Sequence, residues 1–140
     1  MKESTCEIID QKILTGKDPS YTEMMSPCGA GIVQLLYNYN GDIYTCDEAR
    51  MIGSDLFLLG SVKKNKYKEV LTSDNMCAVL AASVNDTKYC DSCAYKPFCG
   101  LCPVCSYAET GNIISSGNHR RCRIYKSQFD FVFDKLACKR

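Results

Sequence analysis

The sequence predicts an α+β fold in which a small β-hairpin is followed by helices and cysteine-rich loops. Two β-prone runs separated by Asn40-Gly41 predict the hairpin. Apolar residues at helical spacing predict a helix near the C-terminus. Between them, residues 86–120 are rich in Cys, Gly and Pro and show little periodicity. We therefore expect this middle segment to take its shape from something bound to it.

The N-terminal part is predicted to be a helix and a linker. Apolar residues at helical spacing favour a helix in residues 1–16, which Gly16 is suited to end. Frequent Asp, Pro, Ser and Thr over residues 17–27 are typical of an irregular connection. Residues 1–25 are thus expected to lead into a main domain, residues 26–140.

The predicted hairpin joins residues 32–39 to residues 42–46. Asn40-Gly41 tolerates positive φ at both central positions of a type I′ turn, which suits a two-residue loop. Cys28 precedes the first strand and Cys46 ends the second, so we expect these two thiols to come close in space.

Further elements follow the hairpin. Residues 56–62 resemble a short strand or an apolar connection broken by Gly60. One helical stretch is expected around Val70, and Ser73 or Asp74 can cap a second helix that runs through residue 82. Residues 123–137 carry apolar residues at i, i+3, i+4 and i+7 and predict a longer helix.

Composition narrows the function classes. The 140 residues can bury a core without covalent cross-links, and the odd count of 11 Cys rules out full internal disulfide pairing. A net charge of +1 provides no long-range field for nucleic acid or an anionic membrane. Residues 1–10 contain no apolar stretch of the secretory-signal kind, and no run predicts a membrane span. We expect a cytoplasmic protein. In the reducing cytosol, a cysteine pattern more often indicates metal binding or catalysis than disulfide bonds.

Five cysteines crowd one short segment. Zinc ribbons separate two Cys-x2-Cys pairs by a longer spacer, and the chain has one histidine, His119, so a zinc site would rely almost wholly on thiolates. Closely spaced cysteines of this kind are typical of iron–sulfur sites. The pattern favours iron–sulfur clusters and leaves open a zinc-binding interaction module or a disulfide-stabilised scaffold. The five cysteines are Cys90, Cys93, Cys99, Cys102 and Cys105.

The full cysteine pattern, from Cys28 to Cys122, resembles the SPASM domain of radical SAM enzymes. That C-terminal module carries auxiliary [4Fe-4S] clusters in peptide-modifying and sulfatase-maturating enzymes. The stretches YNYNGDIYTCDEARM, residues 37–51, and YKPFCGLCPV, residues 95–104, are most similar to maturases of the His-Xaa-Ser peptide system. The resemblance covers about residues 26–137.

The resemblance implies ligands for two clusters. In the usual pattern three residues separate the third and fourth cysteines of the run, but Cys102 follows Cys99 after two, and Cys105 lies beyond it. Many members also have an additional cysteine a few residues before the hairpin cysteine, but residues 21–27 of this chain contain none. We expect Cys102 to join the proximal set, with Cys105 as its fourth ligand or with one iron left open. The proximal set is then Cys28, Cys46, Cys102 and Cys105, and the distal set is Cys90, Cys93, Cys99 and Cys122.

Three cysteines lie outside this pattern and are not expected to bind metal: Cys6, Cys77 and Cys138. Cys77 sits on a predicted helix and is expected to be a small buried apolar residue.

Charged residues lie beside two of these cysteines. In related maturases an Asp placed like Asp47 is a candidate general base, although Asp47 could equally cap the following turn. Arg120, Arg121 and Arg123 flank Cys122 and could offset the negative charge of a cluster, or form an ordinary basic surface.

The predicted function is an auxiliary cluster domain that transfers electrons and helps to hold a precursor peptide or protein during post-translational modification. The radical SAM core motif Cys-x3-Cys-x2-Cys is absent. This chain alone is therefore not expected to cleave S-adenosylmethionine. We expect it to act with a radical SAM core in the same parent chain or in a separate one.

Overall fold

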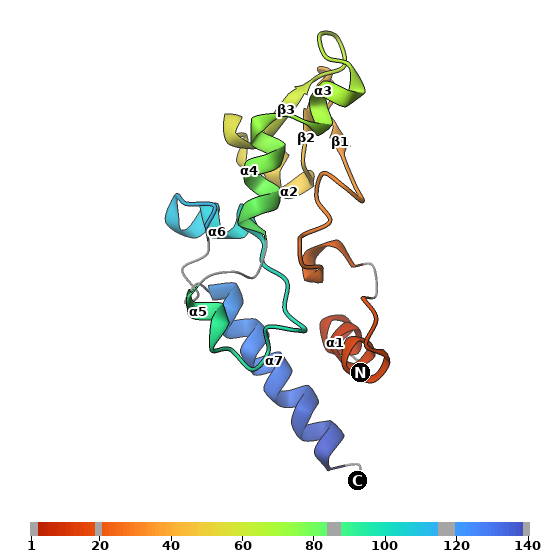
Figure 1. Ribbon diagram of the computed structural model, residues 1–140, viewed down its shortest axis with the longest axis vertical. Coiled ribbons are helices and arrows are strands. Elements are labelled where there is room, and N and C mark those ends of the chain that lie inside the picture. The colour runs from red at the N-terminus through yellow and green to blue at the C-terminus, as the bar shows by residue number, and fades with distance from the viewer. Residues whose placement is uncertain (1–2, 19–20, 84–87, 115–119, 139–140) are drawn as a thin grey trace.

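The computed structural model describes residues 3–18, 21–83, 88–114 and 120–138. His119 lies outside these ranges. The molecule is elongated, with a small sheet at one end and two helices, α1 and α7, at the other (Figure 1). Both chain ends lie at the helical end. Among the described residues, no helix has the length and apolar content needed to cross a bilayer.

The sheet has three antiparallel strands in the order β1-β2-β3. Strand β1 is Leu36–Tyr37, β2 is Asp42–Tyr44 and β3 is Leu58–Ser61. Leu36 pairs with Tyr44, and Ile43 pairs with Gly60 of β3. The predicted hairpin and third strand are therefore confirmed, with a first strand shorter than expected.

The hairpin turn differs from the predicted two-residue turn. The Asn38 N–H donates to the Asp42 carbonyl at 2.8 Å, and the Gly41 N–H donates to the Asn38 carbonyl at 2.9 Å. The loop therefore holds three residues, Tyr39 to Gly41, and Gly41 adopts the positive φ of +97° that three-residue hairpins place at their last position.

Helices cover the sheet and complete its core. They are α2 (Asp47–Ile52), α3 (Tyr67–Leu71) and α4 (Asp74–Ala82), with a 3-10 turn at Asp55–Phe57. The Ser73 hydroxyl accepts from the Met76 N–H at 3.3 Å and caps α4, as predicted for this position. Ile43, Leu59, Val70 and Met76 form the apolar centre.

The segment predicted to be irregular contains two helices, α5 (Lys88–Asp91) and α6 (Pro103–Thr110). Helix α6 has a clear local cause. Cys102 occupies its N-cap and Pro103 its first turn, where a missing N–H costs nothing. The cysteine-rich composition concealed this start signal, because a cysteine is not a usual N-cap residue.

The opposite end is built on α7 (Arg120–Ala137), which packs against α1 (Ser4–Thr15). Their shared core contains Ile9, Met24, Phe129 and Val132. Tyr95 stacks on Phe129 with ring centroids 5.0 Å apart, so the cysteine-rich loop joins this core. Both helices confirm the sequence prediction, and Gly16 ends α1 with φ +64°.

One buried position was predicted wrongly. Cys77 was expected to be a small apolar core residue, but it lies on the exposed face of α4. Its neighbours Met76 and Val79 face inward instead.

Replacing Phe129 by alanine is expected to destabilise the protein by about 3–5 kcal/mol, because Phe129 is fully buried where α1, α7 and the cysteine-rich loop meet. Phe131→Ala is the matched control, since that ring is 53% exposed on the same helix. Chemical denaturation of the two variants under identical metal loading measures the difference. An equal loss of unfolding free energy in both variants would contradict this account of the core.

Candidate metal centre

The structure gathers the eight predicted ligand cysteines into two groups of four. One group, here the α7-side group, lines a single cavity and consists of Cys90, Cys93, Cys99 and Cys122. The other, here the sheet-side group, belongs to one apolar core and consists of Cys28, Cys46, Cys102 and Cys105. No disulfide joins any of the cysteines in the part of the chain that the structure describes.

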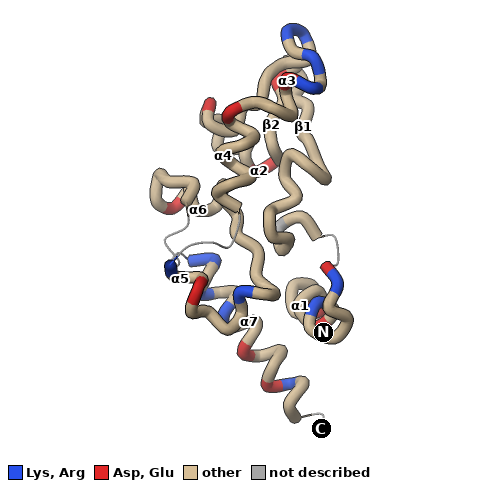
Figure 2. The backbone as a smooth tube through the Cα atoms, viewed as in Figure 1, with Lys and Arg blue, Asp and Glu red and all other residues tan. Residues whose placement is uncertain are grey.

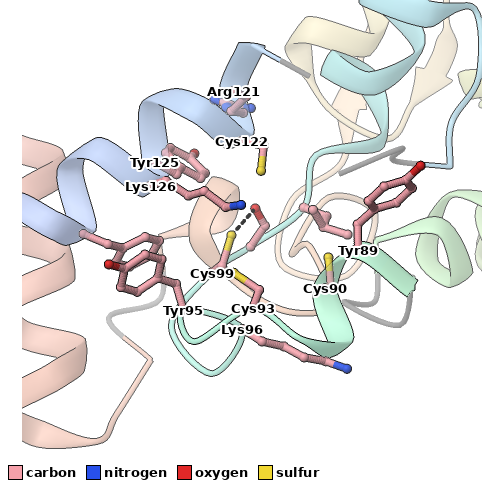
Figure 3. Close-up of a pocket in the computed structure, with 13 residues that line it drawn as sticks. Tyr89, Cys90, Cys93, Tyr95, Lys96, Cys99, Arg121, Cys122, Tyr125 and Lys126 are labelled. Carbon is pink, nitrogen blue, oxygen red and sulfur yellow. Dashed lines mark hydrogen bonds between the residues drawn. The ribbon is translucent and has the colours of Figure 1, made fainter. Parts of the chain in front are cut away.

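Successive turns present the α7-side thiols. Cys90 is on α5, and the Cys93 N–H donates to the Cys90 carbonyl at 3.1 Å, which closes a turn between them. The Cys99 N–H donates to the Tyr95 carbonyl at 3.0 Å and closes the next turn. Cys122 comes from the first turn of α7. Figure 3 shows the four sulfur atoms directed into the same space.

Burial and the negative charges of neighbouring thiolates oppose ionisation of two of these thiols, those of Cys99 and Cys122. Burial raises the pKa of Cys99 to about 12, and the negative charges that Cys122, Cys90 and Cys93 would carry add to the effect. Burial also raises the pKa of Cys122, although the nearby Lys126 ammonium opposes this. Four thiolates could thus coexist here only around a positively charged centre.

Contacts with the N-terminal segment hold the cysteine turn in place. A Cβ atom on Gly100 would lie 2.7 Å from the Met24 carbonyl carbon and the Met25 oxygen, so no larger residue fits after Cys99. The buried Lys12 ammonium donates to the Met24 carbonyl at 2.6 Å. Its charge also acts on the Cys99 thiol. The sequence did not predict this role of Lys12, because a lysine in an ordinary helix pattern gives no sign of contact with a cysteine far along the chain.

The sheet-side thiols belong to an apolar core near the sheet. Cys28, Cys46 and Cys102 are buried with Ala49 and Phe57, and Cys105 packs against them half-buried. Two of them occupy helix N-caps, Cys46 before α2 and Cys102 before α6. The Cys28 N–H donates to the buried Ser83 hydroxyl at 3.0 Å, which ties this group to the end of α4.

The thiols at these two N-cap positions differ in acidity. Burial raises the pKa of Cys46 to about 12, and the neighbouring Glu48 carboxylate adds to the rise. A hydrogen bond from the Cys105 thiol lowers the pKa of Cys102 to about 6, against the effect of burial, and the Arg121 charge contributes. The Arg121 guanidinium also donates to the Cys105 sulfur at 3.0 Å. This contact was not foreseen, because Arg121 was expected to act beside Cys122.

Two buried hydroxyls have no hydrogen-bond partner among the described residues. They belong to Thr45 and Ser106, which precede Cys46 and follow Cys105. Buried hydroxyls are normally paired with protein, water or a bound group. The sheet-side group itself offers four thiols, the donors that bind iron–sulfur clusters, and the two unpaired hydroxyls belong to residues next to it in the sequence.

Asp47 lies in the first turn of α2 and is exposed. Its carboxylate accepts from the Arg50 guanidinium at 2.8 Å. It is thus next to a sheet-side cysteine in sequence, with its side chain reaching the solvent.

The remaining cysteines lie outside both groups. Cys6 is half-buried on α1, and Cys77 and Cys138 are exposed. Among the described residues, no three His, Cys, Asp or Glu side chains come close enough to hold one metal ion. A cubane cluster requires a wider arrangement, because each of its thiolates binds a different iron atom.

Comparisons with known proteins agree with this geometry. The sequence model of the SPASM family, described as an iron-sulfur cluster-binding domain, matches residues 28–94. This agrees with the resemblance seen in the sequence; the closer likeness to His-Xaa-Ser system maturases stays a prediction. No curated protein matches the chain.

Several solved structures share the fold. The native protein anSMEcpe with bound AdoMet has a TM-score of 0.68 and 21% identity over 95% of this chain. Its complexes with AdoMet and the peptides Cp18Cys and Kp18Cys give TM-scores of 0.67 and 0.66, each at 20% identity over 95% of this chain. The chain spans only about a third of their length, 34%, 35% and 34% respectively. The mixed helical fold with a small three-stranded sheet is therefore shared with this part of those proteins.

In the metal-free protein, thiolate absorbance is expected to rise in a first step near pH 6, because Cys102 loses its proton well below the ordinary thiol range. Cys102→Ser should remove this step. Cys46→Ser should leave it in place, since burial keeps Cys46 protonated until about pH 12. An anaerobic ultraviolet pH titration measures all three proteins, and a first step near pH 8.5 in the unsubstituted chain would refute the assignment.

Proposed function

We propose that this chain is an auxiliary domain that binds two [4Fe-4S] clusters and serves a radical SAM enzyme acting on a peptide or protein. The observation that carries the proposal is the division of eight cysteines into two groups of four, each drawn from distant parts of the chain. The match to an iron-sulfur cluster-binding family supports it.

The α7-side group would hold one cluster and the sheet-side group the other. Bound clusters of this type supply one-electron transfer over a wide range of potentials. The protein's part is to fix the thiolates, exclude water and set the local charge. Tyr95, Phe129 and Leu101 enclose the α7-side cavity, and Tyr95 also donates a hydrogen bond to the Asp130 carboxylate, which holds the loop on α7.

The partner classes follow from the proteins of similar fold. They were solved with bound AdoMet and, in two cases, with a peptide. We extend both features to the enzyme in which this chain acts: a radical SAM core that binds S-adenosylmethionine, and a precursor peptide or protein as substrate. This work would take place in the cytoplasm, where thiols stay reduced.

Anaerobic reconstitution is expected to load about eight irons and eight sulfides per chain, with the broad visible absorption of iron–sulfur clusters. Cys99→Ala should reduce the iron to about four, because one ligand of the α7-side group is lost. Cys77→Ala is the matched control and should retain about eight, since Cys77 is exposed and outside both groups. Stoichiometric zinc without iron would instead establish the zinc-binding module.

The fourth ligand of the sheet-side group is tested by comparing Cys102→Ala with Cys105→Ala. If both thiols are ligands, each variant should lose or destabilise one cluster, measured as iron per chain after desalting. Iron loss in Cys102→Ala alone would show that the sheet-side cluster has an open iron. Unchanged iron in both would refute the assignment of this group.

Asp47 is proposed as the general base for the substrate. In the enzyme containing the radical SAM core, Asp47→Asn is expected to lower turnover by about 10²–10⁴-fold without loss of iron. Arg50→Gln is the control, because it removes the ion pair and keeps the carboxylate. Equal effects of the two substitutions would indicate that Asp47 acts only through the first turn of α2.

A further inference from the structure

Several basic residues lie in the first turns of α7 (Figure 2). The N-terminal end of a helix carries partial positive charge and favours acidic residues, yet the first turn of α7 contains none. Cations in this position are unfavourable unless negative charge lies close by. The basic residues are Arg120, Arg121, Arg123 and Lys126.

Arg121 and Arg123 differ sharply in their surroundings. The half-buried Arg121 donates from Nη1 to the Cys105 sulfur at 3.0 Å, and its guanidinium carbon lies 5.5 Å from the centre of the Tyr125 ring. The guanidinium is thus held between a sulfur and an aromatic face. Arg123 is exposed and is not among the residues that line the α7-side cavity.

Arg121 lies next to both cysteine groups. It precedes Cys122 in the chain and lines the α7-side cavity, while its hydrogen bond goes to Cys105 of the sheet-side group. A second contact supports the same junction, because the Glu109 carboxylate of α6 accepts from the Arg120 N–H at 2.8 Å. Helices α6 and α7 are therefore joined beside Arg121, which contacts both groups.

We propose that Arg121 is a positioning residue that holds Cys105 in the sheet-side group and sets the reduction potential of the cluster bound there. The inference rests on the proposed function. Adding one electron makes a thiolate-bound cluster more negative by one charge, and a nearby guanidinium stabilises that added charge. Hydrogen bonds to the ligand sulfurs act in the same direction. The same contact favours Cys105 as the fourth ligand over an open iron.

The test compares Arg121→Gln, Arg121→Lys and Arg123→Gln in anaerobically loaded protein. Dithionite supplies the electrons, and electron paramagnetic resonance follows the reduction of each cluster. Arg121→Gln should lower the equilibrium constant for one-electron reduction of the sheet-side cluster about tenfold. This corresponds to a reduction potential about 59 mV lower. Arg121→Lys should keep most of the wild-type potential, because the charge remains. Arg123→Gln should match wild type, since it removes an equal charge from an exposed position on the same helix.

The outcomes separate the inference from the function on which it rests. The sheet-side signal is identified as the one lost in Cys102→Ala. Equal shifts in Arg121→Gln and Arg123→Gln, or an unchanged potential in Arg121→Gln, would overturn the inference while leaving the two clusters in place. If circular dichroism shows that Arg121→Gln does not fold, Arg121→Lys provides the test. A tenfold change in the reduction equilibrium of the sheet-side cluster in Arg121→Lys, despite the retained charge, would also overturn the inference. Failure of the wild-type chain to bind iron would overturn the proposed function itself.

Discussion

Cysteines from widely separated parts of the chain lie together in two groups, and each group joins elements that are distant in the sequence. The elements between them are short: β1 has two residues and α5 has four. Such elements are not stable alone, because they fix many backbone angles for few hydrogen bonds. A group bound by four thiolates would add its binding free energy to the folded state only, and would therefore stabilise every element that supplies a ligand.

In both groups, thiols that resist ionisation lie near positively charged side chains. Burial makes three of the thiols hard to ionise, those of Cys46, Cys99 and Cys122, and for the last two the negative charges of neighbouring thiolates oppose ionisation further. Cationic side chains lie close to each group: Lys12 and Lys126 near the α7-side group, and Arg121 near the sheet-side group. These cations offset only part of the charge that eight thiolates would carry. A full set of bare thiolates is thus unfavourable, and a bound positively charged centre would relieve the repulsion.

Much of this arrangement could be predicted from local sequence signals. The hairpin, the Ser73 cap and the periodicity of α7 depend on neighbouring residues, and each was predicted. The start of α6 was missed because Cys102 acts as an N-cap through its sulfur, an unusual role for cysteine. The contacts of Lys12 and Arg121 could not be predicted, because they form only once distant segments have packed. Which cysteines share a group is likewise a tertiary property, and the family pattern supplied that expectation where spacing alone did not.

The packing of Gly100 against Met24 and Met25 has a practical meaning for work with this protein. The N-terminal helix is joined to the cysteine loop by this contact, by the Lys12 hydrogen bond and by a shared apolar core with α7. A shortened expression clone that begins near residue 26 would remove one wall of the loop that carries Cys99. Crystallisation or spectroscopic work on the isolated cysteine-rich region should therefore retain residues 3–25, even though they contain none of the eight cysteines proposed as ligands.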